Sequence, residues 1–413
     1  MPDKLREAPP TAGLPLRWRD FLPAPGRQLE VGLASFLRLP SVQIECSGTA
    51  ALIVALTTLK RSSTRRSVVI PAYTCPLVVL AIRHCGLKTV LCDLRQDHFD
   101  LSPQALEEVC NGDTLAIVPT HLGGRVADTV SAKKMARRIG ASVIEDAAQS
   151  LGATWQGQPV GTLGDAGFYS LAVGKGLTLF EGGVLVAGDA GLRQRLHETS
   201  EEIAPYRLIW EIRRLLELAG YTALYRSFGL RLAYGMPLRR ALREGKLIEA
   251  VGDNFSADIP VHRVGAWRRA IGANALARLP SFLEVLSEQA ASRKTKLMAI
   301  QGITVMDDLE GGRGTWPYLM VLMPTVQARD AALARLWPAG LGVSRLFIHA
   351  LPDYPYLSAH LGKVDVPNAR DFAARMLTIS NSPWLDETDF MRIRQVLAQC
   401  AELTVTAETA ADR

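Results

Sequence analysis

Short apolar runs alternate with helical patterns from about residue 42 to residue 187, and this alternation limits the fold more than any other feature. The expected strands are 67–70, 89–94, 115–119, 142–146, 166–171 and 183–187, and the expected helices are 49–60, 76–85, 103–110 and 129–139. Strands that are buried on both faces read as continuous apolar, β-branched runs, and alternating helices return the chain over the sheet. We therefore expect an α/β fold with a mostly parallel sheet.

A Ser-Gly-Thr turn at residues 47–49 opens the first of these helices. Serine is one of the residues that commonly cap the start of a helix, so Ser47 is a candidate cap. The free N–H groups of a helix start, together with the helix dipole, bind phosphate well. Taken alone, the turn is best interpreted as a plain helix cap. A phosphate site becomes the better interpretation when the turn is considered together with the four polar residues described next.

Four polar residues between 143 and 183 stand at the ends of expected strands. Asp146 follows a buried strand where a parallel sheet opens onto a cleft, and Gln149 comes three residues later. Ser170 lies at the end of another strand, and Lys175 lies just past it in a Gly-rich turn. An acid, an amide, a hydroxyl and a lysine in these places can together hold pyridoxal phosphate.

The motifs of this stretch also carry a family resemblance. Glu-Asp-Ala-Ala-Gln at 145–149, Gly-Asp-Ala-Gly-Phe-Tyr-Ser at 164–170, Lys175 and Glu-Gly-Gly at 181–183 resemble the sugar aminotransferases of the DegT/DnrJ/EryC1/StrS family. The resemblance implies a fold-type I pyridoxal-phosphate enzyme. Its large domain has a mostly parallel mixed sheet flanked by helices, and a smaller α+β domain follows at the C-terminus.

The resemblance assigns chemical roles to three of these residues. Lys175 would hold the cofactor through its amine and, once freed, would move the proton between substrate and cofactor. Asp146 would keep the pyridine nitrogen protonated, so that the ring withdraws electrons. Gln149 would hydrogen-bond the 3-oxygen of the ring. Family members that dehydrate sugars carry His in place of the lysine, so Lys175 favours amino transfer.

The remaining cofactor contacts are also carried over from the family. Gly48, Thr49 and Ser170 match the residues that hold the cofactor phosphate. Cys75 stands where relatives have a Phe or Trp stacked on the ring, and we include it among the cofactor-binding residues. Tyr73 is a substitute for that aromatic residue if the loop shifts, and otherwise both residues are simply packed.

A homodimer with the active site at the subunit interface is a further implication of the resemblance. Arg263 matches the family, but Val261 stands where relatives have an Asn that reaches the cofactor phosphate of the neighbouring subunit. His121, at an expected strand end near the cleft, is either a structural histidine or a substrate contact.

We divide the chain into an N-terminal arm (1–30), a large pyridoxal-phosphate-binding domain (31–190), a basic amphipathic helical insertion (191–255) and a small C-terminal domain (256–413). The six prolines between residues 1 and 28 predict an irregular arm that lies on the surface or on a partner subunit. In the small domain, Asn368 and Asp386 are candidates to cap the last two helices.

The segment 206–247 is strongly basic, and its excess of positive charge equals the net charge of +6 of the whole chain. Two apolar stripes follow helical spacing, one through Leu208, Ile209, Ile212, Leu215 and Leu216, and the other through Tyr221, Leu224, Tyr225, Phe228 and Leu232. Such a segment suits a membrane surface or an anionic lipid-linked substrate. It equally suits helices packed on the core or on a second subunit. No nucleic-acid module accompanies the charge, so we expect no nucleic-acid partner.

Two classes of function remain open. The first is an aminotransferase that transfers an amino group from glutamate to a keto sugar, usually nucleotide-linked, in amino-sugar or surface polysaccharide biosynthesis. Its rival within the same class acts on a lipid-linked or hydrophobic carbonyl at the membrane surface. The second class is a non-catalytic regulatory protein that binds pyridoxal phosphate, and it predicts an appended DNA-binding domain or a broken Lys/Asp pair. The sequence shows neither.

The apolar runs and the cysteines of the sequence indicate the cellular compartment of the protein. The longest apolar runs fall far short of the roughly 20 residues that span a bilayer, and the first ten residues have no apolar signal core. The six cysteines form no CxxC pair and no cluster with zinc spacing, so we expect no metal site and a reducing compartment. We therefore expect a cytoplasmic enzyme, with membrane association as the alternative.

Overall fold

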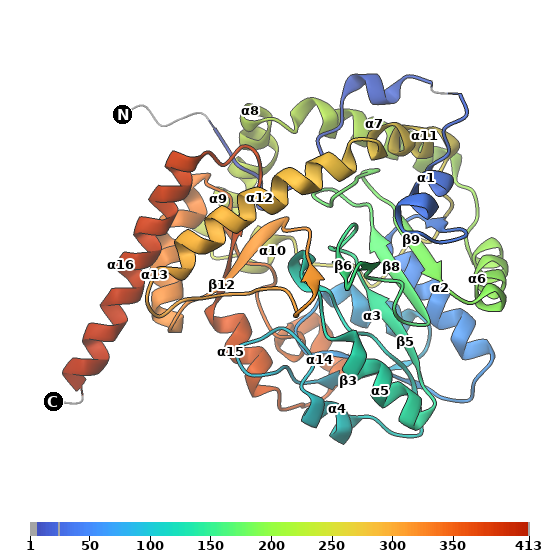
Figure 1. Ribbon diagram of the computed structural model, residues 1–413, viewed down its shortest axis with the longest axis horizontal. Coiled ribbons are helices and arrows are strands. Elements are labelled where there is room, and N and C mark those ends of the chain that lie inside the picture. The colour runs from blue at the N-terminus through green and yellow to red at the C-terminus, as the bar shows by residue number, and fades with distance from the viewer. Residues whose placement is uncertain (1–5, 24, 412–413) are drawn as a thin grey trace.

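The computed structural model describes residues 6–23 and 25–411, with side chains up to residue 402. A seven-stranded sheet with the order β1-β9-β8-β5-β4-β2-β3 forms its centre (Figure 1). The strands are β1 (Gln43–Glu45), β2 (Ser67–Pro71), β3 (Lys88–Cys92), β4 (Thr114–Ile117), β5 (Ser142–Asp146), β8 (Ala166–Ser170) and β9 (Gly183–Ala187). Strands β3, β2, β4, β5 and β8 are parallel, whereas β9 and β1 are antiparallel to their neighbours. The predicted mostly parallel sheet is confirmed.

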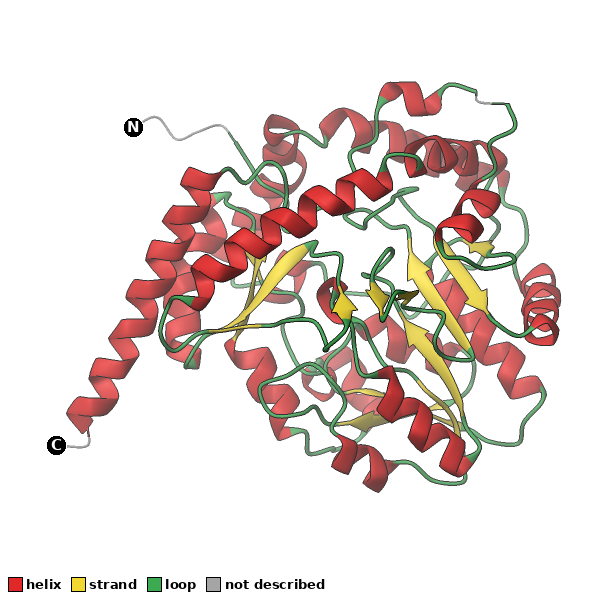
Figure 2. Cartoon of the chain, viewed as in Figure 1, coloured by secondary structure: helices red, strands yellow, loops and turns green. Residues whose placement is uncertain are grey.

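Helices cover both faces of this sheet, as Figure 2 shows. Val68 and Ile70 of β2 pack toward α2 (Gly48–Arg61) and α3 (Pro76–His84), while Val69 packs toward α4 (Pro103–Val109) and α5 (Thr129–Ile139). Successive residues of a strand point to opposite faces, so a strand buried on both sides needs an unbroken apolar run. The run at residues 67–71 is buried throughout for this reason.

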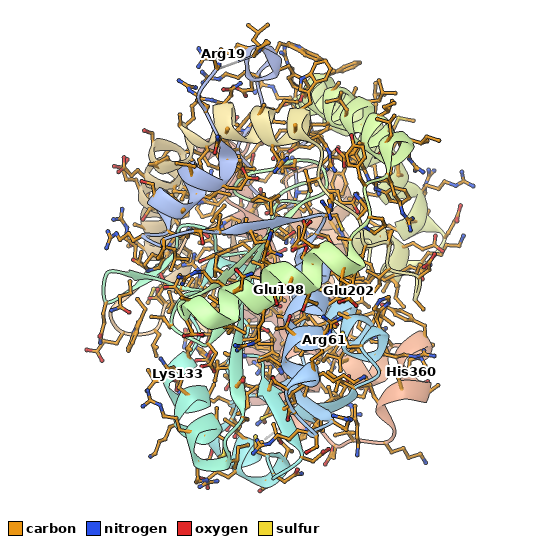
Figure 3. All side chains as sticks on the ribbon, turned by 90° about the vertical axis from the view of Figure 1, so that its right-hand side faces the viewer. Arg19, Arg61, Lys133, Glu198, Glu202 and His360 are labelled. Atoms are coloured by element: carbon orange, nitrogen blue, oxygen red, sulfur yellow. The ribbon has the colours of Figure 1, made fainter. Side chains whose placement is uncertain are left out.

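Helix α6 (Ala190–Ile203) lies across α2 at one side of the molecule. Figure 3 shows Glu198 and Glu202 of α6 close to Arg61 of α2, and Nη2 of Arg61 lies 2.7 Å from Oε1 of Glu202. Beneath this ion pair, the hydroxyls of Thr58 and Thr199 are hydrogen-bonded at 2.9 Å. The pair of helices therefore closes the edge of the large sheet near β9.

The C-terminal part contains a four-stranded antiparallel sheet with the order β10-β12-β14-β13. Its strands are β10 (Thr304–Val305), β12 (Tyr318–Leu322), β13 (Val343–Ser344) and β14 (Met376–Ser380). Helices α13 (Val326–Leu336) and α16 (Glu387–Ala411) pack on it in a separate core. The long helices α11 (Ala266–Leu276) and α12 (Leu279–Met298) lead into this sheet from the large one (Figure 1). Together with the large sheet, this confirms the predicted fold class.

The smaller elements connect these layers. A third, three-stranded sheet consists of β6 (Thr154–Trp155), β7 (Gln158–Pro159) and β11 (Gly312–Arg313). The remaining helices are η1 (Trp18–Phe21), α1 (Leu29–Phe36), η2 (Leu122–Gly124), η4 (Trp337–Ala339), η5 (Leu351–Asp353), α14 (Pro355–Leu361) and α15 (Pro367–Arg375). Among the described residues, no helix combines the length and the apolar character needed to cross a bilayer.

The basic segment folds into a chain of helices that begins at the top of the view in Figure 1 with α7 and α8 and continues toward the centre with α10. These are α7 (Leu208–Leu224), α8 (Ser227–Leu230), η3 (Arg231–Gly235), α9 (Met236–Arg243) and α10 (Leu247–Val251). The guanidinium of Arg268 binds the Glu211 carboxylate with both partners buried, and Trp210 and Arg214 both donate to Glu181. Helix α7 is therefore held by these polar contacts together with Leu218 and the partly buried Leu215, whereas Leu208, Ile209, Ile212 and Leu216 of the first apolar stripe point outward.

The N-terminal arm departs from the prediction, although residues 1–5 and 24 lie outside the described residues. Ala8, Ala12 and Leu14 are buried, so this part of the arm does not lie on the surface. Its amides bond to distant carbonyls, including Ala12 N to Pro317 O at 2.9 Å. Prolines interrupt regular structure, but they do not prevent an extended strand of backbone from being inserted between other segments.

The predicted caps have different outcomes. Asp386 accepts a hydrogen bond from Asp389 N at 2.9 Å and caps α16, as expected. Asn368 is not a cap, because it lies inside α15 and its amide donates to Leu94 O. Instead, the carboxylate of Asp93 accepts from the backbone amides of Asn368 and Ala369, so the helix start is satisfied from another part of the chain.

Candidate active site

One cavity of about 420 Å³ opens at the carboxyl ends of the parallel strands, between the large sheet and the end of the insertion. All of the residues that we predicted to contact a cofactor line it: Gly48, Thr49, Cys75, Asp146, Gln149, Ser170 and Lys175. The carboxyl edge of a parallel sheet is where ligands bind in open α/β folds. The structure thus brings together side chains from four separate segments of the sequence.

The start of α2 forms one end of the cavity. Ser47 caps the helix by accepting from Ala50 N at 3.0 Å, which leaves the first amides of the helix facing the cavity wall. Gly183 allows β9 to lie against this turn, because a Cβ at that position would lie 2.3 Å from Ser47 O. Ser170 lies beside Gly48, where an added Cβ would come within 3.3 Å of the Ser170 Cβ.

Asp146 ends β5 at the floor of the cavity and is buried. Burial raises the pKa of its carboxyl group to about 6, although a hydrogen bond from Ala148 N at 3.0 Å stabilises the charged form. A carboxylate in such a place is costly unless a positive group lies against it.

His121 also lines the cavity, beside this floor, and its ring binds the neighbouring Glu145. Its Nδ1 accepts from Ala127 N at 3.0 Å, so Nε2 carries the proton and donates to Glu145 at 2.9 Å. Glu145 also accepts from backbone amides of the 161–164 turn. Burial favours its neutral form, but these hydrogen bonds hold the pKa of Glu145 below its usual value. Because both ring nitrogens are engaged in these contacts, the structural interpretation of His121 is favoured over a substrate contact.

Gln149 is held in one orientation. Its Oε1 accepts from Gly123 N at 2.7 Å and from the Tyr318 hydroxyl at 2.7 Å. Because a backbone amide can only donate, this fixes the oxygen of the side-chain amide and leaves its NH₂ group to donate into the cavity. Sequence reasoning found Gln149 but missed Tyr318, which comes from β12 of the small sheet.

Lys175 is half-buried on the turn between β8 and β9. Burial lowers the pKa of its amine, while the nearby Cys75 and Asp146 act in the opposite direction. The N-terminal arm clamps the turn on both sides: the Thr11 hydroxyl donates to Gly174 O at 3.0 Å and Leu14 N donates to Gly176 O at 3.1 Å.

The clamp is in turn anchored by the insertion. The Tyr225 hydroxyl, at the end of α7, accepts from Gly13 N at 3.2 Å. Its ring stacks on Tyr221 at 4.6 Å and meets Trp384 edge-on at 4.8 Å. The helical insertion therefore supports the turn that carries the lysine, a link that no sequence pattern suggested.

The structure distinguishes Cys75 from Tyr73 as candidates for the residue that would stack on the cofactor ring. Cys75 lines the cavity, and burial raises the pKa of its thiol to about 12, so it is uncharged. Tyr73 does not line the cavity: its hydroxyl bonds the backbone of Phe347, and its ring packs edge-on against Phe372 at 5.2 Å. Phe347 itself lines the cavity and was missed from the sequence.

The end of the insertion supplies a further wall that sequence reasoning missed. Residues 251–253 and Phe255 line the cavity. Asp253 accepts from the Tyr354 hydroxyl at 2.5 Å and from Ile348 N at 3.0 Å, and burial raises its pKa to about 6. No motif marks these residues, because the tertiary packing of the insertion brings them to the site.

The segment that matched the family's subunit contact lies elsewhere. Arg263 binds the carboxylate of Glu201 at 2.9 Å and the carbonyl of Ala204 at 2.9 Å, on the side of α6. Val261 packs against the apolar core. Neither residue lines the cavity of its own chain.

Comparison with known proteins gives a family and a fold. The model of the DegT/DnrJ/EryC1/StrS aminotransferase family matches residues 25–206 and 250–398, so 207–249 lies between the matched segments. GDP-perosamine synthase of Caulobacter vibrioides is 27% identical over 86% of this chain and 85% of its own length. A putative L-glutamine:3-amino-2,3-dideoxy-scyllo-inosose aminotransferase of Streptomyces kanamyceticus is 37% identical, over only 36% of either chain.

Among solved structures, the PLP form of the putative sugar aminotransferase Spr1654 from Streptococcus pneumoniae has a TM-score of 0.72. It is 18% identical and covers 96% of this chain and 99% of its own, so it supports the fold alone. The family model spans most of the chain and includes every segment that lines the cavity. The chain belongs to the DegT/DnrJ/EryC1/StrS aminotransferase family.

Proposed function

We propose that the protein is a cytoplasmic pyridoxal-phosphate-dependent aminotransferase that aminates a nucleotide-linked keto sugar in amino-sugar or surface polysaccharide synthesis. The observation that carries the proposal is that Lys175, Asp146 and Gln149 line one cavity with the start of α2. The names of the relatives agree with it, since one is a GDP-perosamine synthase and the other an aminotransferase.

The residues of the cavity fit pyridoxal phosphate. The first amides of α2, with Gly48, Thr49 and Ser170, suit a phosphate group. Gln149 has only its NH₂ group left to donate, which suits the phenolic oxygen of the ring. Asp146 is a buried carboxylate that lacks a positive partner at hydrogen-bonding distance among the described residues, which suits a protonated ring nitrogen. These protein groups complement the phosphate, the phenolic oxygen and the ring nitrogen of pyridoxal phosphate, and so they support it as the cofactor.

The cofactor, when bound, supplies an electron sink for the carbon that loses a proton. Lys175 has an amine whose pKa is lowered, so more of it is neutral and able to bind a carbonyl or to accept that proton. Asp146 keeps the ring nitrogen protonated, and Gln149 orients the ring. The clamp of the arm on residues 174–176 limits the positions that the amine can take.

Different observations bear on the identity of the amino donor and on the identity of the amino acceptor. Glutamate is the donor that the family resemblance implies, whereas the Streptomyces relative is named for L-glutamine. Phe255 and Asp253, from the end of the insertion, line the wall of the cavity and are placed to select the acceptor. A lipid-linked or hydrophobic carbonyl is the rival acceptor, and it is favoured only by the surface described below.

The test is a half-reaction followed by the absorbance of the cofactor. The holoenzyme is mixed with glutamate or glutamine, and then with a panel of nucleotide-linked keto sugars and lipid-linked carbonyls. Borohydride reduction followed by peptide mass spectrometry should place the cofactor on Lys175. Lys175→Ala should fold and bind the cofactor without transferring an amino group, and Lys133→Ala, on α5, is the matched control. Labelling of another lysine, or full turnover by Lys175→Ala, would disprove the assignment.

We also propose that the insertion contacts a membrane surface. The exposed apolar residues of α7–α9, called the insertion face, are Leu208, Ile209, Ile212, Leu216, Leu224, Phe228, Leu232 and Met236. Ile209 is 86% exposed and Leu216 is 68% exposed. Exposed arginines, among them Arg207 and Arg226, accompany this face. An apolar face with basic residues around it suits an anionic lipid surface.

Vesicle co-sedimentation tests the membrane contact. Binding to anionic vesicles should weaken as salt rises, because the Debye length falls from about 10 Å at 0.1 M to about 3 Å at 1 M. Ile209→Ser with Leu216→Ser should abolish binding, whereas Val31→Ser with Val285→Ser, which alters exposed apolar residues elsewhere, should not. Equal binding to neutral and anionic vesicles, or none at low salt, would reject the proposal and leave a second subunit as the cover of this face.

We propose, finally, a homodimer with its active sites at the interface, as the family resemblance implies. Because Val261 replaces the family's Asn, we expect the neighbouring subunit to contribute less to the cofactor phosphate than in relatives. Light scattering of the active enzyme tests this, and a fully active monomer would contradict it.

A further inference from the structure

A second groove, of about 670 Å³, lies between α9 and α13 and shares no lining residue with the active cavity. Its floor is apolar and consists of Leu242, Leu247, Leu333, Ala334, Trp337 and Pro338. One wall belongs to the insertion and the other belongs to the small sheet's helix α13 with η4. An apolar groove of this size can hold the body of a small amphiphile.

The lining of the groove carries an excess of positive charge. Arg239, Arg243, Arg329 and Arg345 line it, and Asp330 is the single acidic residue among its described lining residues. Asp330 lies 3.0 Å from Nε of Arg329, and Glu7 neutralises Arg239 at 2.7 Å. Arg243 and Arg345 form no ion pair with the described carboxylates, so two positive charges stay uncompensated.

Two buried N–H donors in the groove also lack a partner within the described part of the chain. Trp337 is 5% exposed and its Nε1 makes no hydrogen bond, and Arg345 is 9% exposed with a free Nε. Leaving a buried donor unsatisfied is unfavourable, and such groups are uncommon in folded proteins. Burial, followed by repulsion from Arg345, lowers the pKa of Arg329 to about 10, although the carboxylate of Asp330 acts in the opposite direction.

We propose that this groove binds an alkyl phosphate, with the phosphate against Arg243 and Arg345 and the alkyl chain along Leu333 and Trp337. A phosphate offers several acceptor oxygens to the guanidinium groups and to the indole N–H. A single carboxylate has fewer acceptor oxygens and would satisfy these donors less completely. The alkyl part covers the apolar floor. This inference is independent of the proposed transamination, and the phosphate belongs either to a membrane lipid or to a soluble phosphomonoester.

Residues that follow Arg345 connect the groove with the active cavity. The Arg345 guanidinium donates to Ile348 O, and Ile348 N donates to Asp253 at 3.0 Å. Leu346 and Phe347, which lie between these two residues, line the active cavity. A ligand in the groove would therefore contact Arg345, which lies at the start of the segment whose Leu346 and Phe347 form part of the active-site wall.

Calorimetric titration of the cofactor-loaded protein tests the proposal, because the loaded cofactor fills the other phosphate site. The probes are monomeric octyl phosphate, inorganic phosphate and octyl glucoside. Octyl phosphate should bind with one-to-one stoichiometry, and each of the other two should bind at least tenfold more weakly. Arg243→Gln should weaken octyl phosphate binding about tenfold, the effect of losing one charge-assisted hydrogen bond. Arg243 is exposed, so this variant is expected to fold.

Arg240→Gln is the matched control, because Arg240 lies on the same helix, pairs with Glu244 and does not line the groove. Equal losses in both variants, or no binding of octyl phosphate, would overturn the proposal. Phosphatidylcholine vesicles with and without phosphatidic acid distinguish the two sources. Phosphatidic acid binding that Arg243→Gln reduces and Arg240→Gln spares assigns a lipid; unchanged vesicle binding with a loss for octyl phosphate assigns a soluble ester.

Discussion

The hydroxyl of Tyr318 donates a hydrogen bond to Oε1 of Gln149 across 2.7 Å, and it joins the small antiparallel sheet to the active cavity. The contact orients the amide toward the cavity, so Tyr318→Phe should reduce cofactor affinity several-fold, for a loss of about 1 kcal/mol. Absorbance titration with pyridoxal phosphate measures this. In a Gln149→Ala background the same change should have no further effect, and additive losses would show that Tyr318 acts by another route.

The stability of the cofactor-free protein should depend on pH through Asp146. Its folded pKa is about 6, above the value of about 3.9 in an unfolded chain. The folded state therefore holds more protons between these values, and stability falls as the pH rises through this window. Asp146→Asn removes that cost and should be more stable than wild type at pH 8 by about 3 kcal/mol.

Urea unfolding at several pH values checks the prediction for Asp146. The difference between variant and wild type should narrow as the pH falls from 6 toward 4. The cofactor-loaded proteins are the control, because a protonated ring nitrogen stabilises the carboxylate and should reverse the order of stability. A gap that does not vary with pH would contradict the assignment of the burial cost to this carboxyl group.

Tyr225→Phe should loosen the turn that carries Lys175. The change removes the acceptor of Gly13 N and so weakens the clamp of residues 11–14 on residues 174–176. We expect faster hydrogen exchange at the amides of Ala12, Gly13 and Leu14, and a fall in kcat with a smaller change in KM. Tyr206→Phe, at an exposed position on the preceding loop, is the control and should change neither.

His121→Phe should destabilise the protein by about 3 kcal/mol, because it leaves the buried Glu145 carboxylate without its strongest side-chain donor. Urea denaturation measures the change. His197→Phe, at an exposed position of α6, should stay within about 0.5 kcal/mol of wild type. A small effect at His121 would mean that the amides of residues 161–164 satisfy Glu145 by themselves.

The strands of the large sheet could be predicted because they are buried on both faces. The run at 67–70 is apolar at every position after Ser67, and the structure places its strand at Ser67–Pro71. Strand β1 was missed because three residues are too few to show a period. The candidate site residues were visible for a similar local reason, since each lies at a strand end or a helix start, within a motif of a few residues.

What the sequence did not reveal depends on contacts between distant segments. Tyr318 and Gln149 are 169 residues apart, and nothing near either residue marks the pair. For α7, the apolar stripe was compatible with packing on the core or with a membrane surface, and the structure instead buries the face that carries Glu211 and Leu218. Hydrophobic periodicity finds the side of a helix that could be buried, whereas a specific ion pair can decide which side is.

The contacts of the N-terminal arm set an order on the synthesis of the protein. Residues 11–14 leave the ribosome before Gly174, Gly176, Tyr225 and Pro317, to which they bond. The arm therefore lacks part of its docking site until Pro317 has been translated. The turn that carries Lys175 reaches its final position only then, so a shortened nascent chain can form the large sheet while still lacking a finished lysine site.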